Sequence, residues 1–345
     1  MKRDLKYVGI MVFNRRQRKR VLQTYRKVAP KGIKIFTFTP SSINWVTKKI
    51  SGLHFANKQF QTGWFRFPDV VYNRCYGADR RLLQRIEKVI GRNRCFNHVN
   101  HFDKQFTYDV LCQTELNKHL PRTVPYNQAN LDTLLTEYGT LYVKPVLGNR
   151  GRGVYRVNKT ETGEVHISEH YFAPHLICRE DHSWEGEIKK LTQSTQYVVQ
   201  QGITFMQVGE KNFDIRVLLQ KVQSGAWGVT NVTSRTAYSG CFNTSVCERV
   251  TTGEERLNSL FSASDTQVLL SSLSEISLKT AALLEQNGKC HLGELSVDFA
   301  LDHNKELWII EVNGNPQRTM YKELENYQNV YRNPIHYAQF LMSQS

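Results

Sequence analysis

The stretch LGELSVDFALDHNKELWIIEVNGNPQ, residues 292–317, decides the fold of this chain. Hydrophobic and polar residues alternate in both of its halves, on either side of a polar turn, which is the pattern of two half-buried strands. We therefore predict a β-hairpin. If the strands pair symmetrically about the turn, Asp298 lies opposite Glu311, and Asn313 shares their face because side chains on one face recur every second residue.

Two carboxylates that face each other across a pair of strands repel, so they need a cation between them or contact with water. Hard oxygen ligands such as those of Asp298, Glu311 and Asn313 suit Mg²⁺, whose remaining ligands are often substrate phosphates. The same pattern fits an ordinary hairpin with a solvated outer face, and the run Asn-Gly-Asn-Pro fits a simple turn. The rest of the chain decides between these interpretations.

Length and composition predict a folded protein of two or three domains, since the chain has 345 residues, 40% of them hydrophobic and 22% charged. No apolar run approaches the ~18 residues that span a bilayer, so we expect no membrane partner. Seven cysteines without a C-x-x-C pair suit a reducing compartment, and we expect a cytoplasmic location. The sequence does not indicate an oligomeric state.

The net charge of +15 predicts an anionic partner. Lysines and arginines are spread along the chain, and the one dense run is RRQRKR at residues 15–20, so nucleic acid is not the favoured partner. An acidic peptide, an acidic polymer or a phosphorylated substrate would account for the charge equally well.

The first hundred residues alternate between strand and helix patterns. Apolar runs at residues 7–13, 33–38 and 68–73 predict strands, with helical spacing between them. This order predicts a small α/β domain with a parallel sheet over residues 1–95. By itself the domain indicates no chemistry.

The second informative stretch is TLYVKPVLGNRGRGVYRV, residues 140–157. A strand that contains Lys144 leads through a glycine-rich turn at residues 148–153 into a second strand. Glycines allow backbone N–H groups to approach a polyphosphate, and Lys144 supplies a positive charge. The spacing excludes Walker and Rossmann loops, because a strand rather than a helix follows the turn. A hairpin tip without function is the alternative.

Three further segments carry candidate residues. Lys104 lies in the first turn of a predicted helix, where it fits either anion binding or a solvated surface. Residues 197–203, YVVQQGI, form either a core strand or a hinge that pairs with an adenine edge. Residues 212–221, NFDIRVLLQK, place Asp214 and Arg216 on one face of a strand, where they must pair with charged neighbours or face a polar cleft.

Basic residues continue towards the C-terminus. Arg235 follows a predicted strand, and residues 240–253, which include Asn243, are predicted to form a long loop. Arg318 follows the hairpin. Basic side chains and a flexible segment near a metal face fit a lid-covered site for a carboxylate, whereas Arg235 alone fits a surface strand equally well.

The ordered set V-K-P, G-x-x-G-x-G, Q-Q-G-I, F-D-I-R-V, Arg235 and D-F…E-V-N-x-N-P resembles the ATP-grasp superfamily over residues 96–345. The phrases YVKPVLGNRGRGVYRV, FDIRVLLQK and ELSVDFALD…LWIIEVNGNPQ resemble the endospore coat-associated YheC/YheD family, and D-I-R and E-V-N are also similar to the glutamate ligase RimK. The resemblance implies a fold with α/β and α+β parts. It implies a pre-ATP-grasp domain at residues 1–95, a small lobe with the phosphate-binding loop at 96–199, and a C-terminal lobe with the magnesium site at 200–345.

The resemblance also implies that the two lobes enclose ATP and Mg²⁺. The loop at residues 240–253 lacks the R-G-G that follows the asparagine in the ligase pattern, so Asn243 matches less closely. The resemblance assigns Lys104 and Lys144 to the phosphates, Gly148, Arg150, Gly151 and Gly153 to the loop over them, Gln200, Gln201 and Ile203 to the adenine, Asp214 to the ribose or its surroundings, Asn243 to the cofactor site, Asp298, Glu311 and Asn313 to magnesium, and Arg216, Arg235 and Arg318 to the acyl phosphate or the carboxylate substrate.

The implied activity is that of an ATP-dependent carboxylate-amine ligase, in which a carboxylate attacks the γ-phosphate and an amine displaces the resulting acyl phosphate. The residue types agree, since phosphoryl transfer needs positioning and charge neutralisation rather than a protein nucleophile. Substrates would be small-molecule or peptide carboxylates and amines, one of them acidic. The alternatives are a spore-coat-associated nucleotide-binding structural protein without turnover and a kinase-like phosphoryl transferase.

Overall fold

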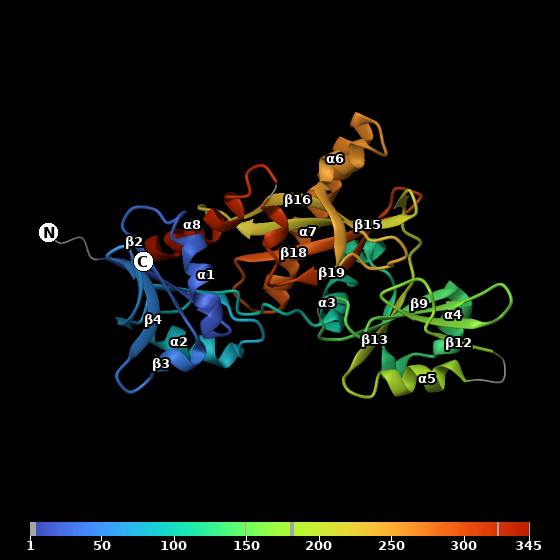
Figure 1. The fold of residues 1–345 in the computed structure, drawn as a ribbon, viewed down its shortest axis with the longest axis horizontal. Coiled ribbons are helices and arrows are strands. Elements are labelled where there is room, and N and C mark those ends of the chain that lie inside the picture. Colours follow the sequence, from blue (N-terminus) through green and yellow to red (C-terminus); the bar gives the residue numbers. More distant parts are fainter. Residues whose placement is uncertain (1–4, 149, 180–182, 323, 345) are drawn as a thin grey trace.

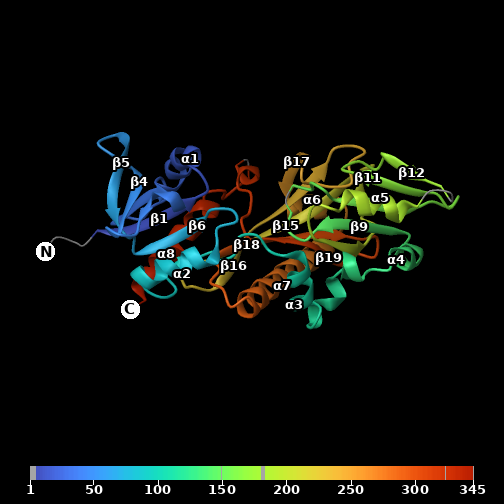
Figure 2. The ribbon, with the colours of Figure 1, turned by 90° about the horizontal axis from the view of Figure 1, so that it is seen from below.

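The computed structural model describes residues 5–148, 150–179, 183–322 and 324–344. These residues form three β-sheets that follow one another along an elongated molecule (Figure 1). The N-terminal sheet lies at one end, the sheet of the middle segment at the other, and the sheet of the C-terminal segment between them (Figures 1 and 2). This combination of α/β and α+β parts confirms the predicted fold class.

The N-terminal sheet has a parallel centre, as predicted. Its main elements are β1 (Lys6–Val12), α1 (Arg15–Tyr25), β2 (Ile33–Phe38), β6 (Val70–Arg74), α2 (Arg80–Ile90) and β7 (Cys95–Phe96). β1 pairs in parallel with β2 and β6, and β6 pairs in parallel with β7. The side chain of Asn14 accepts a hydrogen bond of 3.2 Å from the backbone N–H of Gln17, so the basic run starts a capped helix.

An antiparallel extension of this sheet was not predicted from the sequence. It comprises β3 (Ile43–Asn44), β4 (Lys49–Ala56) and β5 (Gln59–Arg66). β4 and β5 are joined through Asn57 and Lys58, which have positive φ angles of 50° and 60°. Two such residues match the twist of a tight hairpin, but the pair lacks the glycine that usually marks this turn in a sequence.

The middle sheet contains the predicted glycine-loop hairpin. Its elements are β8 (Thr123–Pro125), α4 (Leu131–Tyr138), β9 (Thr140–Pro145), β10 (Tyr155–Lys159), β11 (Val165–Glu169), β12 (Leu176–Cys178), α5 (Trp184–Leu191) and β13 (Tyr197–Gln201). β9 pairs antiparallel with β10 on one side and with β13 on the other. The strands on either side of the loop therefore form as predicted, and both helices contribute to the core of this sheet.

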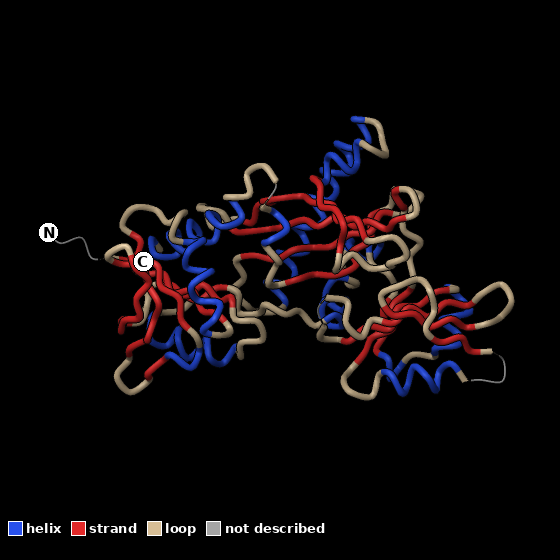
Figure 3. The backbone as a smooth tube through the Cα atoms, viewed as in Figure 1, coloured by secondary structure: helices blue, strands red, loops and turns tan. Residues whose placement is uncertain are grey.

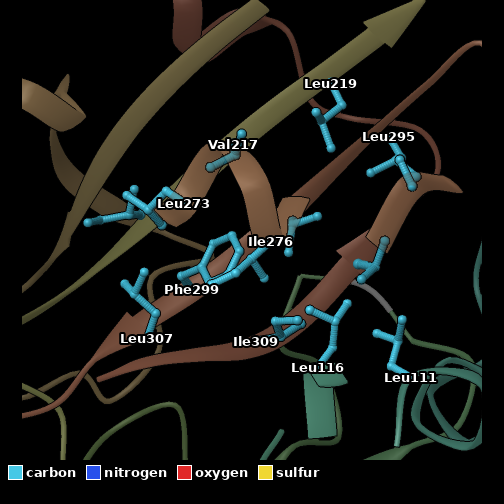
Figure 4. Close-up of a cluster of buried hydrophobic side chains, with 14 of the residues drawn as sticks. Leu111, Leu116, Val217, Leu219, Leu273, Ile276, Leu295, Phe299, Leu307 and Ile309 are labelled. Atoms are coloured by element: carbon cyan, nitrogen blue, oxygen red, sulfur yellow. The ribbon is translucent and has the colours of Figure 1, made fainter. Parts of the chain in front are cut away.

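The C-terminal sheet carries the predicted hairpin in its order β17-β16-β15-β18-β19. Its elements are β14 (Gln207–Val208), β15 (Lys211–Lys221), β16 (Trp227–Ala237), β17 (Cys247–Thr252), β18 (Glu294–Leu301) and β19 (Leu307–Asn313). Asp298 lies opposite Glu311, which confirms the predicted register. Val217 and Phe299 on the sheet pack against Leu273 and Ile276 of α7 (Ala263–Asn287) in the core (Figure 4).

The predicted face assignment on β19 is wrong in part. Strict alternation places Trp308, Ile310 and Val312 on the apolar face, but the ladder shifts by one residue between Asp298 and Phe299. Because a bulge inserts one extra residue, the side chains before it change face relative to those after it. Ile309 therefore belongs to the core, whereas Ile310 lines a cavity beside Glu311.

The remaining short elements lie within or between the segments of the three sheets, as the alternation of helix, strand and loop along the backbone shows (Figure 3). The prediction of one long loop at residues 240–253 is wrong in its second half, because β17 occupies it and pairs with β16. The short elements outside the sheets are α3 (Lys104–Leu111), α6 (Gly253–Asn258), and the 3₁₀ helices η1 (Pro40–Ser42), η2 (Glu115–His119), η3 (Tyr126–Gln128) and η4 (Thr319–Tyr321).

The C-terminal helix α8 (Asn329–Ser343) returns to the N-terminal sheet. Its residues Ile335 and Ala338 pack in one core with Val8, Ile10 and Leu22. The apolar face of α8 thus covers a sheet that starts more than 300 residues earlier. The domain boundaries at residues 95 and 199 stay predictions. No described helix is both long and apolar enough to cross a membrane.

A buried carboxylate joins the N-terminal sheet to the C-terminal sheet. Glu294 on β18 is fully buried, and it accepts hydrogen bonds from the Tyr72 hydroxyl at 2.7 Å, Asn97 Nδ2 at 3.0 Å and Gln220 Nε2 at 3.0 Å. It also forms an ion pair with Arg318. Burial alone would raise the pKa of Glu294, but the Arg318 guanidinium holds that pKa below its usual value. The carboxylate therefore stays charged and ties three segments together.

We expect Glu294→Ala to destabilise the fold by about 3–5 kcal/mol, because it leaves Arg318 buried without its carboxylate. The measurement is the free energy of unfolding in urea, followed by circular dichroism. Glu248→Ala is the control, since it breaks the partly exposed pair with Lys211 and should cost at most about 1 kcal/mol. Equal unfolding free energies for the two variants would contradict the assignment of Glu294 as the link between the sheets.

Candidate nucleotide and magnesium site

A single cavity of about 830 Å³ collects the predicted site residues. The loop around Gly148 and the end of β13 line part of it, and α1 and the end of β6 line another part. These elements lie far apart along the long axis in both views, so the cavity reaches from the middle segment to the N-terminal sheet (Figures 1 and 2). Every predicted site residue except Gly153 lines it, although the role of each one stays a prediction.

The C-terminal sheet places a ladder of charges on the cavity side. Asp214 lies opposite Arg235, and Arg216 lies opposite Asp298, in the registers of β15 with β16 and with β18. Arg216 Nε and one terminal nitrogen each donate to Asp298 at 2.6 Å, and Arg235 donates to Asp298 at 3.0 Å. Both alternatives predicted for Asp214 and Arg216 are present, because they pair with charged neighbours and also line the cavity.

These pairs determine the charge state of Asp298, which is 4% exposed. Burial alone would raise the pKa of Asp298, but Arg216 and Arg235 hold that pKa below its usual value. Arg235 also donates to Asp214 at 2.9 Å through Nε. In this structure the repulsion between the facing carboxylates is therefore relieved in part by guanidinium groups.

Glu311 and Asn313 complete the oxygen-rich face on β19. Lys104 Nζ lies 3.1 Å from Glu311 Oε1, and the Asn313 amide lies 3.3 Å from an oxygen of Asp298. Lys104 is the first residue of α3, and its backbone N–H donates to Val146 O at 3.1 Å, next to the glycine loop. Two carboxylates and an amide oxygen form a donor set that fits Mg²⁺, with Glu311 and Asn313 more open to the cavity than Asp298.

Lys144 is a buried cation without a carboxylate partner among the described residues. It is 8% exposed, it donates a short hydrogen bond to the side-chain oxygen of Gln200, and its Nζ lies 5.3 Å above the Tyr142 ring. Burial, and secondarily the charge of Lys104, lowers the pKa of Lys144 to about 8. A buried ammonium of this kind gains most from a nearby phosphate, because it otherwise lacks a compensating charge.

The glycine loop packs against the segment that contains Asn243. Gly151 has a φ of 68°, and a Cβ there would lie 2.8 Å from Ser245 Oγ and 2.9 Å from Asn243 Nδ2. Asn243 also contacts His170 Nδ1 at 3.1 Å, so it has local partners in addition to its predicted cofactor role. Gly153 N–H donates to Glu169 Oε1 at 3.2 Å, which fixes the end of the loop. Asn149, which lies within the predicted turn, is outside the described residues.

Two of the predicted adenine residues, Gln200 and Gln201, end β13, and Ile203 follows it. Gln200 Nε2 donates to Thr123 Oγ1 at 3.0 Å, and Gln201 Oε1 accepts from the backbone N–H of Arg122 at 3.2 Å. Both glutamine side chains are thus engaged within the middle sheet, which leaves Ile203 and the nearby backbone at the cavity wall. The apolar wall around them includes three residues that were not predicted as site residues: Tyr142, Phe205 and Ile310.

The cavity end at the N-terminal sheet was not foreseen from the sequence. Arg20 on α1, Arg74 at the end of β6 and Lys322 after η4 line it. The basic run at residues 15–20 forms the start of α1. Nothing in the sequence indicated that one face of this helix turns towards the hairpin, almost 300 residues away.

The three-sheet fold, with this cavity between its parts, is that of an ATP-grasp protein. A family model described as YheC/D like ATP-grasp matches residues 92–341, so the chain belongs to the YheC/D-like ATP-grasp family. The resemblance noted in the sequence is thereby confirmed.

Two Bacillus subtilis proteins are similar in sequence. Endospore coat-associated protein YheD is 25% identical over 300 residues, which cover 83% of this chain and 65% of YheD. Endospore coat-associated protein YheC is 23% identical over 358 residues, which cover 98% of this chain and 96% of YheC. The chain thus spans about two-thirds of YheD and nearly all of YheC.

Solved structures of ligases share the fold. The D-Ala:D-Ser ligase VanG from Enterococcus faecalis superimposes with a TM-score of 0.56 at 12% identity, over 98% of both chains. The ATP-grasp ligase PsnB, solved with a minimal precursor, Mg and ADP, gives a TM-score of 0.56 at 13% identity, also over 98% of both chains. At these identities the likeness establishes the fold and leaves the substrates of this chain open.

We expect the affinity for Mg·ATP to fall progressively as the pH rises through about 8. Burial depresses the pKa of Lys144 to about 8, so its ammonium loses the proton that a phosphate requires as pH rises through that value. Calorimetry between about pH 7.5 and about pH 9.5 measures this change. Lys144→Arg is the matched control, because arginine keeps its charge and should remove the decline. A constant wild-type affinity across this range would refute the assignment of Lys144 to the phosphates.

Proposed function

We propose that this chain is an ATP-dependent carboxylate-amine ligase that acts through an acyl phosphate. One observation supports this proposal above the others: Lys104 and Lys144, the ion-paired Arg216 and Arg235, and the oxygen-rich face of the hairpin line the same cavity. Lysines neutralise phosphate charge, and guanidinium groups bind carboxylate and phosphate oxygens. The ligase folds of VanG and PsnB agree with this reaction class.

In the proposed reaction, ATP lies with its phosphates towards Lys104 and Lys144 and its base near Ile203. Asp298, Glu311 and Asn313 would hold Mg²⁺, which shields the charge of the triphosphate. A substrate carboxylate oxygen attacks the γ-phosphorus, the bond to the β-phosphate oxygen breaks, and ADP leaves. An amine then attacks the acyl carbon, loses a proton and releases inorganic phosphate.

The carboxylate and amine are proposed to be small molecules or peptide groups. PsnB was solved together with a minimal precursor, so a precursor molecule is one candidate substrate for this chain too. By analogy with the names of YheC and YheD, we propose an association with the spore coat after cytoplasmic synthesis.

Release of ADP and phosphate in the presence of Mg²⁺, measured across pools of carboxylic acids and amines, tests the reaction class. Stimulation by a carboxylate, together with trapping of the acyl group by hydroxylamine, supports ligation. A phosphorylated product without a trapped acyl group supports a kinase-like transferase instead. Binding of ATP without turnover in any pool supports a structural nucleotide-binding protein.

We expect Glu311→Gln to lower turnover at least about 100-fold while the fold is retained. Its side chain is 30% exposed and its only ion pair within the described part of the chain is with Lys104, so the stability cost is at most about 1 kcal/mol. The readouts are ADP release and the melting temperature. Asp298→Asn should lower both turnover and stability, because it disturbs a buried pair with two arginines. Unimpaired turnover in Glu311→Gln would refute the magnesium assignment.

A further inference from the structure

We propose that the carboxylate substrate carries a second anionic group, which binds at the end of the cavity formed by α1, the end of β6 and the segment after η4. The inference rests on the proposed function, because it concerns the substrate of the same cavity. It specifies a class of substrate, namely acids with two or more negative charges.

The first observation is a set of cations from three separate segments. Arg20 lies on the face of α1 that also presents Gln17 and Thr24, at helical spacings of three and four residues. Arg74 ends β6, and Lys322 follows η4. All three line the cavity, and within the described parts of the chain none of them forms an ion pair with a carboxylate.

The second observation is the distribution of negative charge in the same cavity. Among the described residues that line it, the carboxylates are Asp214, Asp298 and Glu311, and each is ion-paired at the magnesium face. None of these three lies on α1, β6 or the segment after η4. Glu294 lies behind this end, where it pairs with Arg318 and interacts electrostatically with Arg74. Arg20 and Lys322 have no carboxylate partner among the described residues, so the α1 end keeps a positive charge that attracts an anion.

The third observation is that buried guanidinium nitrogens at this end have no partner among the described residues. Arg74 Nε and Arg318 Nε are buried without a hydrogen-bond acceptor there, and Arg318 is only 5% exposed. The Arg74 guanidinium lies 5.6 Å from the centre of the Tyr25 ring, and the Tyr25 hydroxyl lies 3.2 Å from that of Tyr72. Tyr72 in turn contacts Arg318 at 2.5 Å. Aromatic contact thus holds Arg74 in place, and the ion pair with Glu294 holds Arg318, before any ligand binds.

The position of the α1 end explains why the anionic group bound there differs from the reacting carboxylate. The reacting carboxylate must reach the phosphates near Lys104 and Lys144, whereas α1 lies towards the other end of the molecule (Figure 1). One carboxylate cannot occupy both positions, so the α1 end would hold a different group of the same substrate. A free ammonium group would be repelled there, which argues against an amine acceptor at that end.

The experiment compares charged acids with neutral isosteres of the same shape. Binding to the full chain saturated with Mg²⁺ and a non-hydrolysable ATP analogue is measured by calorimetry, with glutamate against glutamine and aspartate against asparagine. A penta-glutamate peptide against a penta-glutamine peptide distinguishes a peptide from a free amino acid. We expect at least about tenfold tighter binding for one charged member over its neutral partner, and weaker binding at high ionic strength.

Variants test the location of the site. Arg74→Gln and Lys322→Gln should each weaken binding of the charged ligand about tenfold, since charge-assisted hydrogen bonds are lost, and should leave the neutral isostere unaffected. Arg16→Gln is the matched control, because this arginine lies on the same helix, is exposed and does not line the cavity. It should bind the acid as the wild type does.

The outcomes separate this inference from the ligase proposal. Charge-selective binding that the two variants abolish, without any ADP release, supports the anion site and contradicts the ligase. ADP release stimulated equally by glutamate and glutamine, with no effect of Arg74→Gln, supports the ligase and overturns the anion site. No charge-selective binding of any tested acid also overturns the anion site.

Discussion

The buried ladder of alternating charges across β16, β15 and β18 is the constraint on which the candidate site depends. Asp214 and Arg235 face each other on one strand pair, and Arg216 and Asp298 on the next. A buried charge is strongly unfavourable without a partner, so each residue requires its neighbour on the adjacent strand. A slip of one residue would also turn the apolar face towards the cavity. The ladder therefore fixes Asp298 on the cavity side of β18, and the separate pairing of β18 with β19 brings Glu311 opposite it.

This ladder also explains why some cations in the cavity are already paired with a carboxylate, whereas another is free to pair with a ligand. Arg216 and Arg235 are committed to carboxylates, and Lys104 is paired with Glu311. Lys144 has only the neutral oxygen of Gln200 among the described polar groups. An entering triphosphate would find an uncompensated charge at Lys144 without first breaking an ion pair. The paired groups would respond only when the charge near the hairpin changes, for example when Mg²⁺ arrives.

The sequence allowed the hairpin, its register and the shared face of Asp214 and Arg216 to be predicted, because local alternation and turn chemistry determine them. The bulge that moves Ile310 into the cavity leaves no comparable pattern. The cations near α1 were missed for a different reason. Because α8 packs on the first sheet, the segment after the hairpin must cross from the C-terminal sheet to the N-terminal sheet. That crossing brings Arg318 into contact with Tyr72 of β6 and Lys322 into the lining of the cavity, and no spacing within the sequence links residues so far apart.

One strand, β18, carries the two carboxylates that hold the two ends of the cavity. Glu294 and Asp298 are four residues apart on one strand, on the same face and about 13 Å apart along it. Glu294 holds Tyr72 and Arg318 at the N-terminal sheet, while Asp298 holds Arg216 and Arg235 at the oxygen-rich face of the hairpin. Both carboxylates are buried and paired, so neither can move without leaving a guanidinium unpaired. The strand therefore sets a fixed separation between the metal face and the cations near α1, and a substrate that engages both must match that length.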